Sequence, residues 1–170
     1  MPGALQAWYG FQDLEMLADR EAELTGEFEI AQLNRLAPLV HAHRDRVIRA
    51  CMRCWRRSDG SLQLQLSYNA ELSLLCQRCL EPVEVNVDET ADWDIGCGGQ
   101  SRATVPAEGD VLDLGDQRVR PLDLLEDELI LSLPMVPRHP SIDECGALAQ
   151  NLDHAAHAEA GESESRTLEV

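Results

Sequence analysis

The feature that most constrains the fold is a long run in which apolar and polar side chains alternate. The apolar members are Leu62, Leu64, Leu66, Tyr68, Ala70, Leu72, Leu74 and Cys76, and the residues between them are polar as far as Ser73. A period of two places the two sets on opposite faces of a β-strand. One face then belongs to the core and the other to solvent, which is typical of an antiparallel sheet.

Two neighbouring segments carry the same alternation. Residues 46–57 precede the long run and are joined to it by Ser58-Asp59-Gly60-Ser61, whose Asp-Gly centre predicts a hairpin turn. Residues 83–95 follow it, with valines on one face and mostly acids on the other. The three segments predict a β-meander of three or more strands.

A helix is predicted over residues 121–133. Pro121 suits a first helical turn, and Pro134 ends the helix. Leucines recur on one face, and further apolar residues widen it: Leu122, Leu125, Leu129 and Leu133, then Leu124, Ile130 and Leu131. The acids Asp123, Glu126, Asp127 and Glu128 are expected to form a solvated face and to interact with the helix dipole.

The two ends of the chain give weaker signals. In residues 1–40, Thr25-Gly26 predicts a turn and a short helix is expected to end near Ala37. The last residues contain few large apolar groups and several acids. We therefore predict one α+β domain over 1–146, in which the helix packs on the meander, and a disordered acidic tail over 147–170.

The N-terminal sequence and the cysteines bear on the cellular compartment. Met1-Pro2-Gly3 has no basic residue, and no long apolar run follows. We therefore expect neither a secretory signal nor a membrane span, and a cytoplasmic location. The six cysteines are then expected to be reduced, which favours metal binding or burial over disulfides.

Two C-x-x-C pairs, Cys51/Cys54 and Cys76/Cys79, together resemble a zinc ribbon, which would be a nucleic-acid-binding module. Strand parity argues against it, because Cys51 and Cys54 would point to opposite faces. Cys76 and Cys79 instead lie at a turn, where both sulfurs face one point. His139 and Cys145 are the candidate third and fourth ligands of a zinc site. The alternative is a pair of buried, reduced thiols.

Evidence for catalysis is poor. The sequence has no glycine-rich phosphate loop and no Ser/His/Asp arrangement. A zinc- or thiol-dependent enzyme remains the alternative function, and it would require an open metal position or a cysteine of low pKa.

The charge distribution bears on whether this chain can bind a nucleic acid. The net charge is −17, which repels nucleic-acid phosphates, but arginines are concentrated between residues 44 and 57. Arg49, Arg53 and Arg57 share a face with Trp55, and guanidinium groups beside an aromatic ring can bind RNA. The alternative is that these arginines pair across strands with acids such as Glu71 and Asp92.

The segment Leu75-Cys76-Gln77-Arg78-Cys79-Leu80-Glu81-Pro82 and the acidic, leucine-rich stretch 123–137 resemble the bacterial YceD family, the large ribosomal RNA subunit accumulation proteins. The likeness spans roughly residues 14–146 and includes Gly26, Pro137-x-His139 and Cys145. Ser163–Val170 departs from the family because it is acidic and lacks an apolar segment and lysines.

The resemblance implies a cytoplasmic, non-enzymatic factor needed for synthesis, processing or stability of 23S ribosomal RNA. Its expected partners are large-subunit ribosomal RNA or basic ribosomal or assembly proteins, with no membrane and no small-molecule substrate. The resemblance also implies one structural zinc, because some relatives carry cysteines where His139 and Cys145 stand in this sequence.

Overall fold

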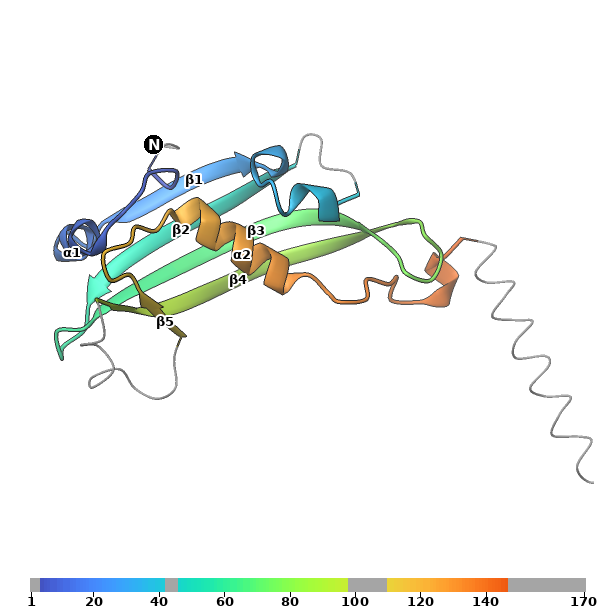
Figure 1. Ribbon diagram of the computed structural model, residues 1–170. Helices are drawn as coiled ribbons and strands as arrows, with labels where there is room; N and C mark the ends of the chain where they lie inside the picture. The colour runs from blue at the N-terminus through green and yellow to red at the C-terminus, as the bar shows by residue number, and fades with distance from the viewer. Residues whose placement is uncertain (1–3, 42–45, 98–109, 147–170) are drawn as a thin grey trace, which may run out of the picture.

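The computed structural model describes residues 4–41, 46–97 and 110–146, and its centre is a single five-stranded sheet (Figure 1). The strands follow one another in chain order: β1 (Glu23–Glu29), β2 (Val47–Arg56), β3 (Leu62–Leu75), β4 (Pro82–Gly96) and β5 (Asp110–Asp113). The first four pair antiparallel, and β5 joins the end of β4 in parallel. The predicted α+β fold is confirmed: β2, β3 and β4 form the predicted meander, β1 extends it at one edge, and β5 adds a short parallel strand at the other.

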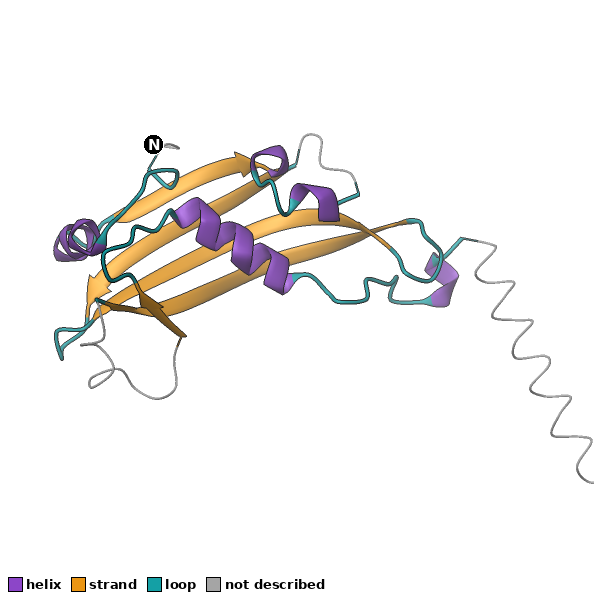
Figure 2. Cartoon of the chain, in the orientation of Figure 1, coloured by secondary structure: helices purple, strands orange, loops and turns teal. Residues whose placement is uncertain are grey.

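One face of this sheet carries the core. The alternating side chains of β3 from Leu62 to Leu74 are buried, as are Ile48, Ala50, Met52 and Cys54 of β2. The helix α2 (Pro121–Ser132) lies across this face, close to its predicted bounds (Figure 2). Leu122, Leu125 and Leu129 are buried under it, whereas Leu131 is 76% exposed and does not widen the apolar face as predicted. Each buried leucine stabilises the fold by roughly 1.5–3 kcal/mol.

The N-terminal prediction is wrong in two respects. Residues 25–26 lie inside β1 rather than in a turn, and the region near Ala37 forms two short 3-10 helices, Ile30–Gln32 and Ala37–Leu39, instead of an α-helix. The helix α1 (Phe11–Asp19) precedes β1 and was not predicted. A Cβ on Gly26 would lie 2.9 Å from Cζ of Phe28, so this glycine allows close packing on the core side of the strand.

Glu126 departs from the predicted solvated face of α2. It is only 6% exposed. Its carboxylate accepts hydrogen bonds from the backbone N–H of Arg35 (2.6 Å) and of Leu36 (3.2 Å), and these compensate for the burial of the charge. The Arg35 side chain donates to the same group over 3.0 Å. Glu126 therefore fastens the segment before β2 to α2.

Two expectations concern the rest of the chain. The predicted acidic tail, 147–170, lies outside the described residues. Within the part of the chain that the structure describes, no helix has the length and apolar character needed to cross a membrane.

Candidate metal centre

The turn between β3 and β4 places the first pair of candidate ligands. The backbone N–H of Cys76 donates to the carbonyl of Glu81 over 2.9 Å, and that of Leu80 donates back to Cys76 over 2.8 Å. Leu80 adopts a positive φ of 61°, which closes the turn directly after Cys79. Cys76 is buried and Cys79 is half-buried at this end of the sheet.

The segment after α2 supplies the other two residues, and it is held against this turn. The N–H of Gln77 donates to the carbonyl of Pro137 over 2.8 Å. The Arg78 guanidinium donates to the carbonyls of His139 (3.0 Å) and Ser141 (2.8 Å). These contacts bring His139 and Cys145 beside the two cysteines of the turn.

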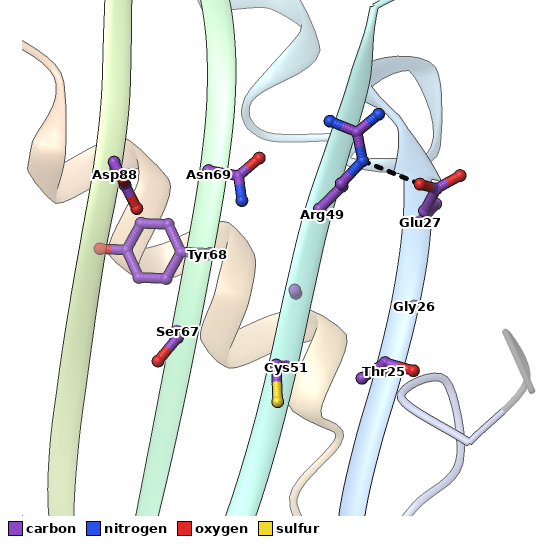
Figure 3. Close-up of a pocket in the computed structure, with 10 residues that line it drawn as sticks. Thr25, Gly26, Glu27, Arg49, Cys51, Ser67, Tyr68, Asn69 and Asp88 are labelled. Carbon is purple, nitrogen blue, oxygen red and sulfur yellow. Dashed lines mark hydrogen bonds and ion pairs between the residues drawn. The ribbon is translucent and has the colours of Figure 1, made fainter.

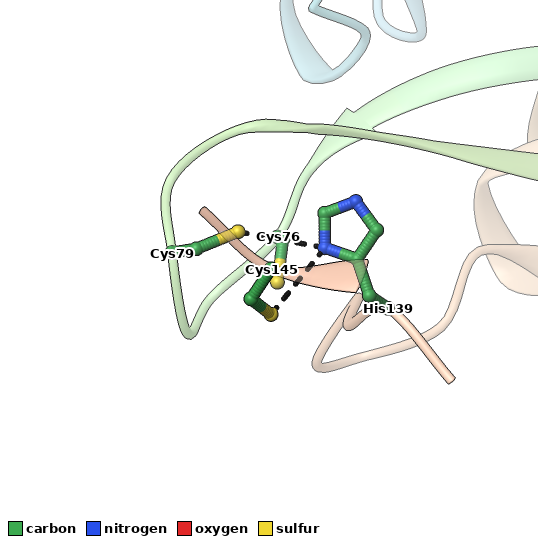
Figure 4. A group of neighbouring side chains, drawn as sticks. All are labelled: Cys76, Cys79, His139 and Cys145. Carbon is green, nitrogen blue, oxygen red and sulfur yellow. Dashed lines mark hydrogen bonds between the residues drawn. The ribbon is translucent and has the colours of Figure 1, made fainter. Parts of the chain in front are cut away.

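The predicted quartet forms one cluster. One ligand atom from each of Cys76, Cys79, His139 and Cys145 lies within 4.8 Å of the others (Figure 4). The Nδ1 atom of His139 is 3.4 Å from the Cys79 sulfur and 3.6 Å from the Cys145 sulfur. A tetrahedral zinc with bonds of about 2.3 Å to sulfur and about 2.05 Å to nitrogen requires S···N separations of about 3.5 Å. Both measured S···N separations match this value, so the cluster could hold a zinc ion.

The orientation of His139 also suits a ligand. Its Nε2 atom lies 3.1 Å from the carbonyl oxygen of Pro82, which can only accept a hydrogen bond. The proton is accordingly assigned to Nε2, and the lone pair of Nδ1 faces the sulfurs. Metal-bound histidines are commonly held by such a hydrogen bond from the second ring nitrogen.

The electrostatic surroundings favour thiolate at Cys76. Burial opposes its ionisation, but backbone N–H groups of Cys79, His139 and Arg78 donate to the sulfur and lower its pKa to about 5. Burial raises the pKa of Cys145, an effect opposed by Arg78, whose Nε lies 3.0 Å from that sulfur. Thiolate is the form that binds metal.

The two other cysteines of the C-x-x-C motifs do not join this cluster. Cys51 lies on the solvent side of β2, with its sulfur 3.2 Å from a Glu23 carboxylate oxygen. Cys54 lies on the core side and is 3% exposed, and burial raises its pKa to about 12. The parity argument is confirmed, and the two C-x-x-C pairs do not combine into a zinc ribbon.

The arginines predicted to contact RNA share a face with half-buried Trp55, but each is matched to a carboxylate. Arg49 pairs with Glu27 at 2.9 Å, and Arg53 pairs with Glu23 at 2.7 Å. Arg57 lies 2.9 Å from Asp94. Cross-strand pairing therefore occurs, although its acids are not the predicted Glu71 and Asp92. RNA contact by this face stays a prediction.

Sequence reasoning did not single out Arg78, although it lies inside the C-x-x-C motif. Its role in holding residues 139–145 depends on a segment about sixty residues away, and no local pattern indicates it.

Comparison with known families settles the relationship of this chain. The profile of the large ribosomal RNA subunit accumulation protein YceD matches residues 64–169. The chain belongs to the YceD family. The YceD match begins in β3, later than the likeness described above, and contains α2 and all four members of the cluster. It ends at residue 169, beyond the likeness that stopped near residue 146, so it includes most of the acidic segment that was expected to depart from the family. A search of curated proteins and a search of solved structures each found no significant match.

Proposed function

We propose that the chain is a cytoplasmic, non-enzymatic factor that supports accumulation of 23S ribosomal RNA through its synthesis, processing or stability. Membership of the YceD family carries this proposal, because the family is described by large ribosomal RNA subunit accumulation. The fold offers a rigid sheet that presents polar side chains, which suits a binding factor.

We also infer that Cys76, Cys79, His139 and Cys145 hold one structural zinc. Four protein ligands would complete a tetrahedral site and leave no position for a substrate or an activated water. Zinc chemistry of this closed kind contributes to stability rather than to catalysis. This supports a non-enzymatic role over a zinc-dependent enzyme. The low pKa of Cys76 would also suit a thiol-dependent enzyme, but a thiolate held as a zinc ligand is not free to act as a nucleophile.

The proposed partner is large-subunit ribosomal RNA or a basic ribosomal or assembly protein. Direct RNA contact through Arg49, Arg53, Trp55 and Arg57 predicts affinity that falls steeply with salt and is lost in the variant carrying Arg49→Glu and Arg53→Glu. If the purified protein has no affinity for RNA at low salt, this direct mode of contact is excluded and a protein partner remains.

Depletion of the chain in its own host tests the function. We expect the ratio of 23S to 16S ribosomal RNA to fall and to recover when the full chain is supplied again. Cys76→Ser combined with Cys79→Ser should restore the ratio poorly if the metal centre maintains the fold. A ratio that depletion leaves unchanged would contradict the proposal.

A further inference from the structure

The face of the sheet opposite α2, here called the outer face, has a groove at its centre (Figure 3). Two hollows of about 540 Å³ and about 440 Å³ adjoin there and share Arg49, Asn69 and Asp88. The first hollow is lined by Thr25, Cys51 and Ser67, which are neighbours across β1, β2 and β3. Thr90 continues this row on β4.

Side-chain size explains why the outer face is hollowed here. The small row Thr25, Cys51, Ser67 and Thr90 lies between two rows of larger residues, Glu27, Arg49, Asn69 and Asp88 on one side, and Glu23, Arg53, Gln65 and Asp92 on the other. A floor of small side chains between taller walls lets an extended backbone approach the sheet closely. The first hollow therefore has the form of a binding site for an unfolded polypeptide segment that crosses the strands, and the second hollow lies on the far side of the row formed by Arg49, Asn69 and Asp88.

The charge of the groove is negative. Arg49 and Arg53 are paired with Glu27 and Glu23 on the same walls, and Arg46 at the far end of the second hollow pairs with Glu84. Asp88 lies on the wall shared by the two hollows, and Glu71 lines the second hollow only. Neither takes part in an ion pair within the described residues. The arginines here are thus neutralised by ion pairs, and the carboxylates of Glu71 and Asp88 remain uncompensated.

We propose that this groove binds an extended, lysine- and arginine-rich protein segment, whose cations reach Glu71 and Asp88. The inference rests on the proposed function and names its partner as basic protein rather than RNA. Surplus carboxylates repel phosphates, which disfavours a nucleic acid in the groove. A second copy of the chain is disfavoured as well, because it would bring its own acidic strands against these acids.

A photoreactive amino acid placed at Asn69 of the full chain tests this binding site in cells that assemble ribosomes. We expect irradiation to cross-link it to lysine- and arginine-rich segments of ribosomal or assembly proteins. The same probe at Gln117, which is exposed but lines neither hollow, should give no such product. The double variant Glu71→Gln with Asp88→Asn should reduce the Asn69 product roughly tenfold, since it removes two charge pairs. The matched control, Glu21→Gln with Asp116→Asn, changes the net charge equally and should leave the product unchanged.

Peptide binding to the purified chain provides a second test, independent of the cellular cross-linking. A synthetic peptide of alternating lysine and serine should bind the full chain roughly tenfold more weakly after Glu71→Gln with Asp88→Asn, and the control variant should bind it normally. Cross-links mainly to RNA, equal products from Asn69 and Gln117, no product at all, or equal loss in both double variants would each overturn the proposal. The 23S to 16S ratio is measured in the same cells. A ratio that depends on the chain but not on Glu71 and Asp88 refutes the groove and leaves the proposed function intact.

Discussion

At the scale of single residues, the buried ionisable groups Glu126 and Cys54 have very different surroundings. Glu126 lies in the middle of α2, yet its carboxylate serves the backbone of residues 35 and 36, which are remote in sequence. Cys54 lies in the apolar core of β2, where no partner compensates the burial of a thiolate. Glu126 leads to a prediction about the stability lost when its hydrogen bonds are removed, and Cys54 leads to a prediction about the pH dependence of stability.

Replacing Glu126 with glutamine should lower the free energy of unfolding by roughly 1.5–3 kcal/mol, the range for hydrogen bonds to a charged group. The amide keeps the size of the side chain but removes the charge and one acceptor. Asp127→Asn is the matched control, because that carboxylate is 52% exposed and its ion pair with Arg35 is worth under about 1 kcal/mol. Urea unfolding of both variants checks this, and equal losses would contradict it.

The buried thiol of Cys54 should make the fold sensitive to alkali. In the unfolded chain the thiol ionises near pH 9, whereas burial in the folded state raises its pKa to about 12. The unfolded state therefore releases a proton first, and the stability contributed by this group falls as the pH rises from about 9 to about 12. Unfolding measured across this range should show a shallower decline in Cys54→Ala than in the native sequence. Parallel curves would count against this account.

At the scale of elements, α2 has leucines both on its buried side and on its exposed side. Leu125 is 1% exposed beneath it and Leu131 is 76% exposed on its far side. The two leucines are chemically identical and differ only in their position around the helix, which makes them a matched pair.

Leu125→Ala should lower the free energy of unfolding by about 2–5 kcal/mol, because it removes buried methyl groups and leaves a cavity. Leu131→Ala should change stability by less than about 0.5 kcal/mol, because that side chain is already in contact with solvent. Denaturant titration of both variants measures the difference. A comparable loss in Leu131→Ala would show that α2 packs differently.

The elements that could be predicted from sequence are those whose pattern repeats without interruption. β3 alternates over its whole length, and α2 repeats its leucines, so the predicted bounds of both elements lie close to those observed. β1 was missed because Gly26 occupies a core-side position between Leu24 and Phe28 and conceals the alternation. The cluster of Cys76, Cys79, His139 and Cys145 could be predicted because cysteine and histidine are uncommon. The contacts of Arg78 and the groove could not, because they depend on tertiary contacts and strand register.

At the scale of the whole molecule, the cluster of cysteines and histidine joins two regions that are distant in the chain. The β3–β4 turn contributes Cys76 and Cys79, and the segment after α2 contributes His139 and Cys145. A metal here would therefore stabilise the attachment of that segment to the sheet as well as the turn itself.

The purified chain is expected to contain one zinc per molecule, measured by elemental analysis. A strong chelator should lower its melting temperature, because a ligand that binds only the folded state stabilises that state. Cys145→Ser should contain little zinc and melt at a temperature that the chelator does not change, whereas Cys51→Ser, outside the cluster, should behave like the native chain. Full zinc retention in Cys145→Ser would contradict the assignment of this ligand.

The position of the cluster also has a consequence for the order of folding. The Cys76–Cys79 turn needs only its own hairpin, but His139 lies 60 residues beyond Cys79, with β4, β5 and α2 in between, and joins the turn only when this long loop closes. Contacts between residues so far apart in sequence form later than the local contacts of a hairpin, because the entropy of the long loop is lost first. Capture of the metal by all four ligands is therefore expected as a late kinetic event, and it would mark chains whose sheet and helix have already assembled.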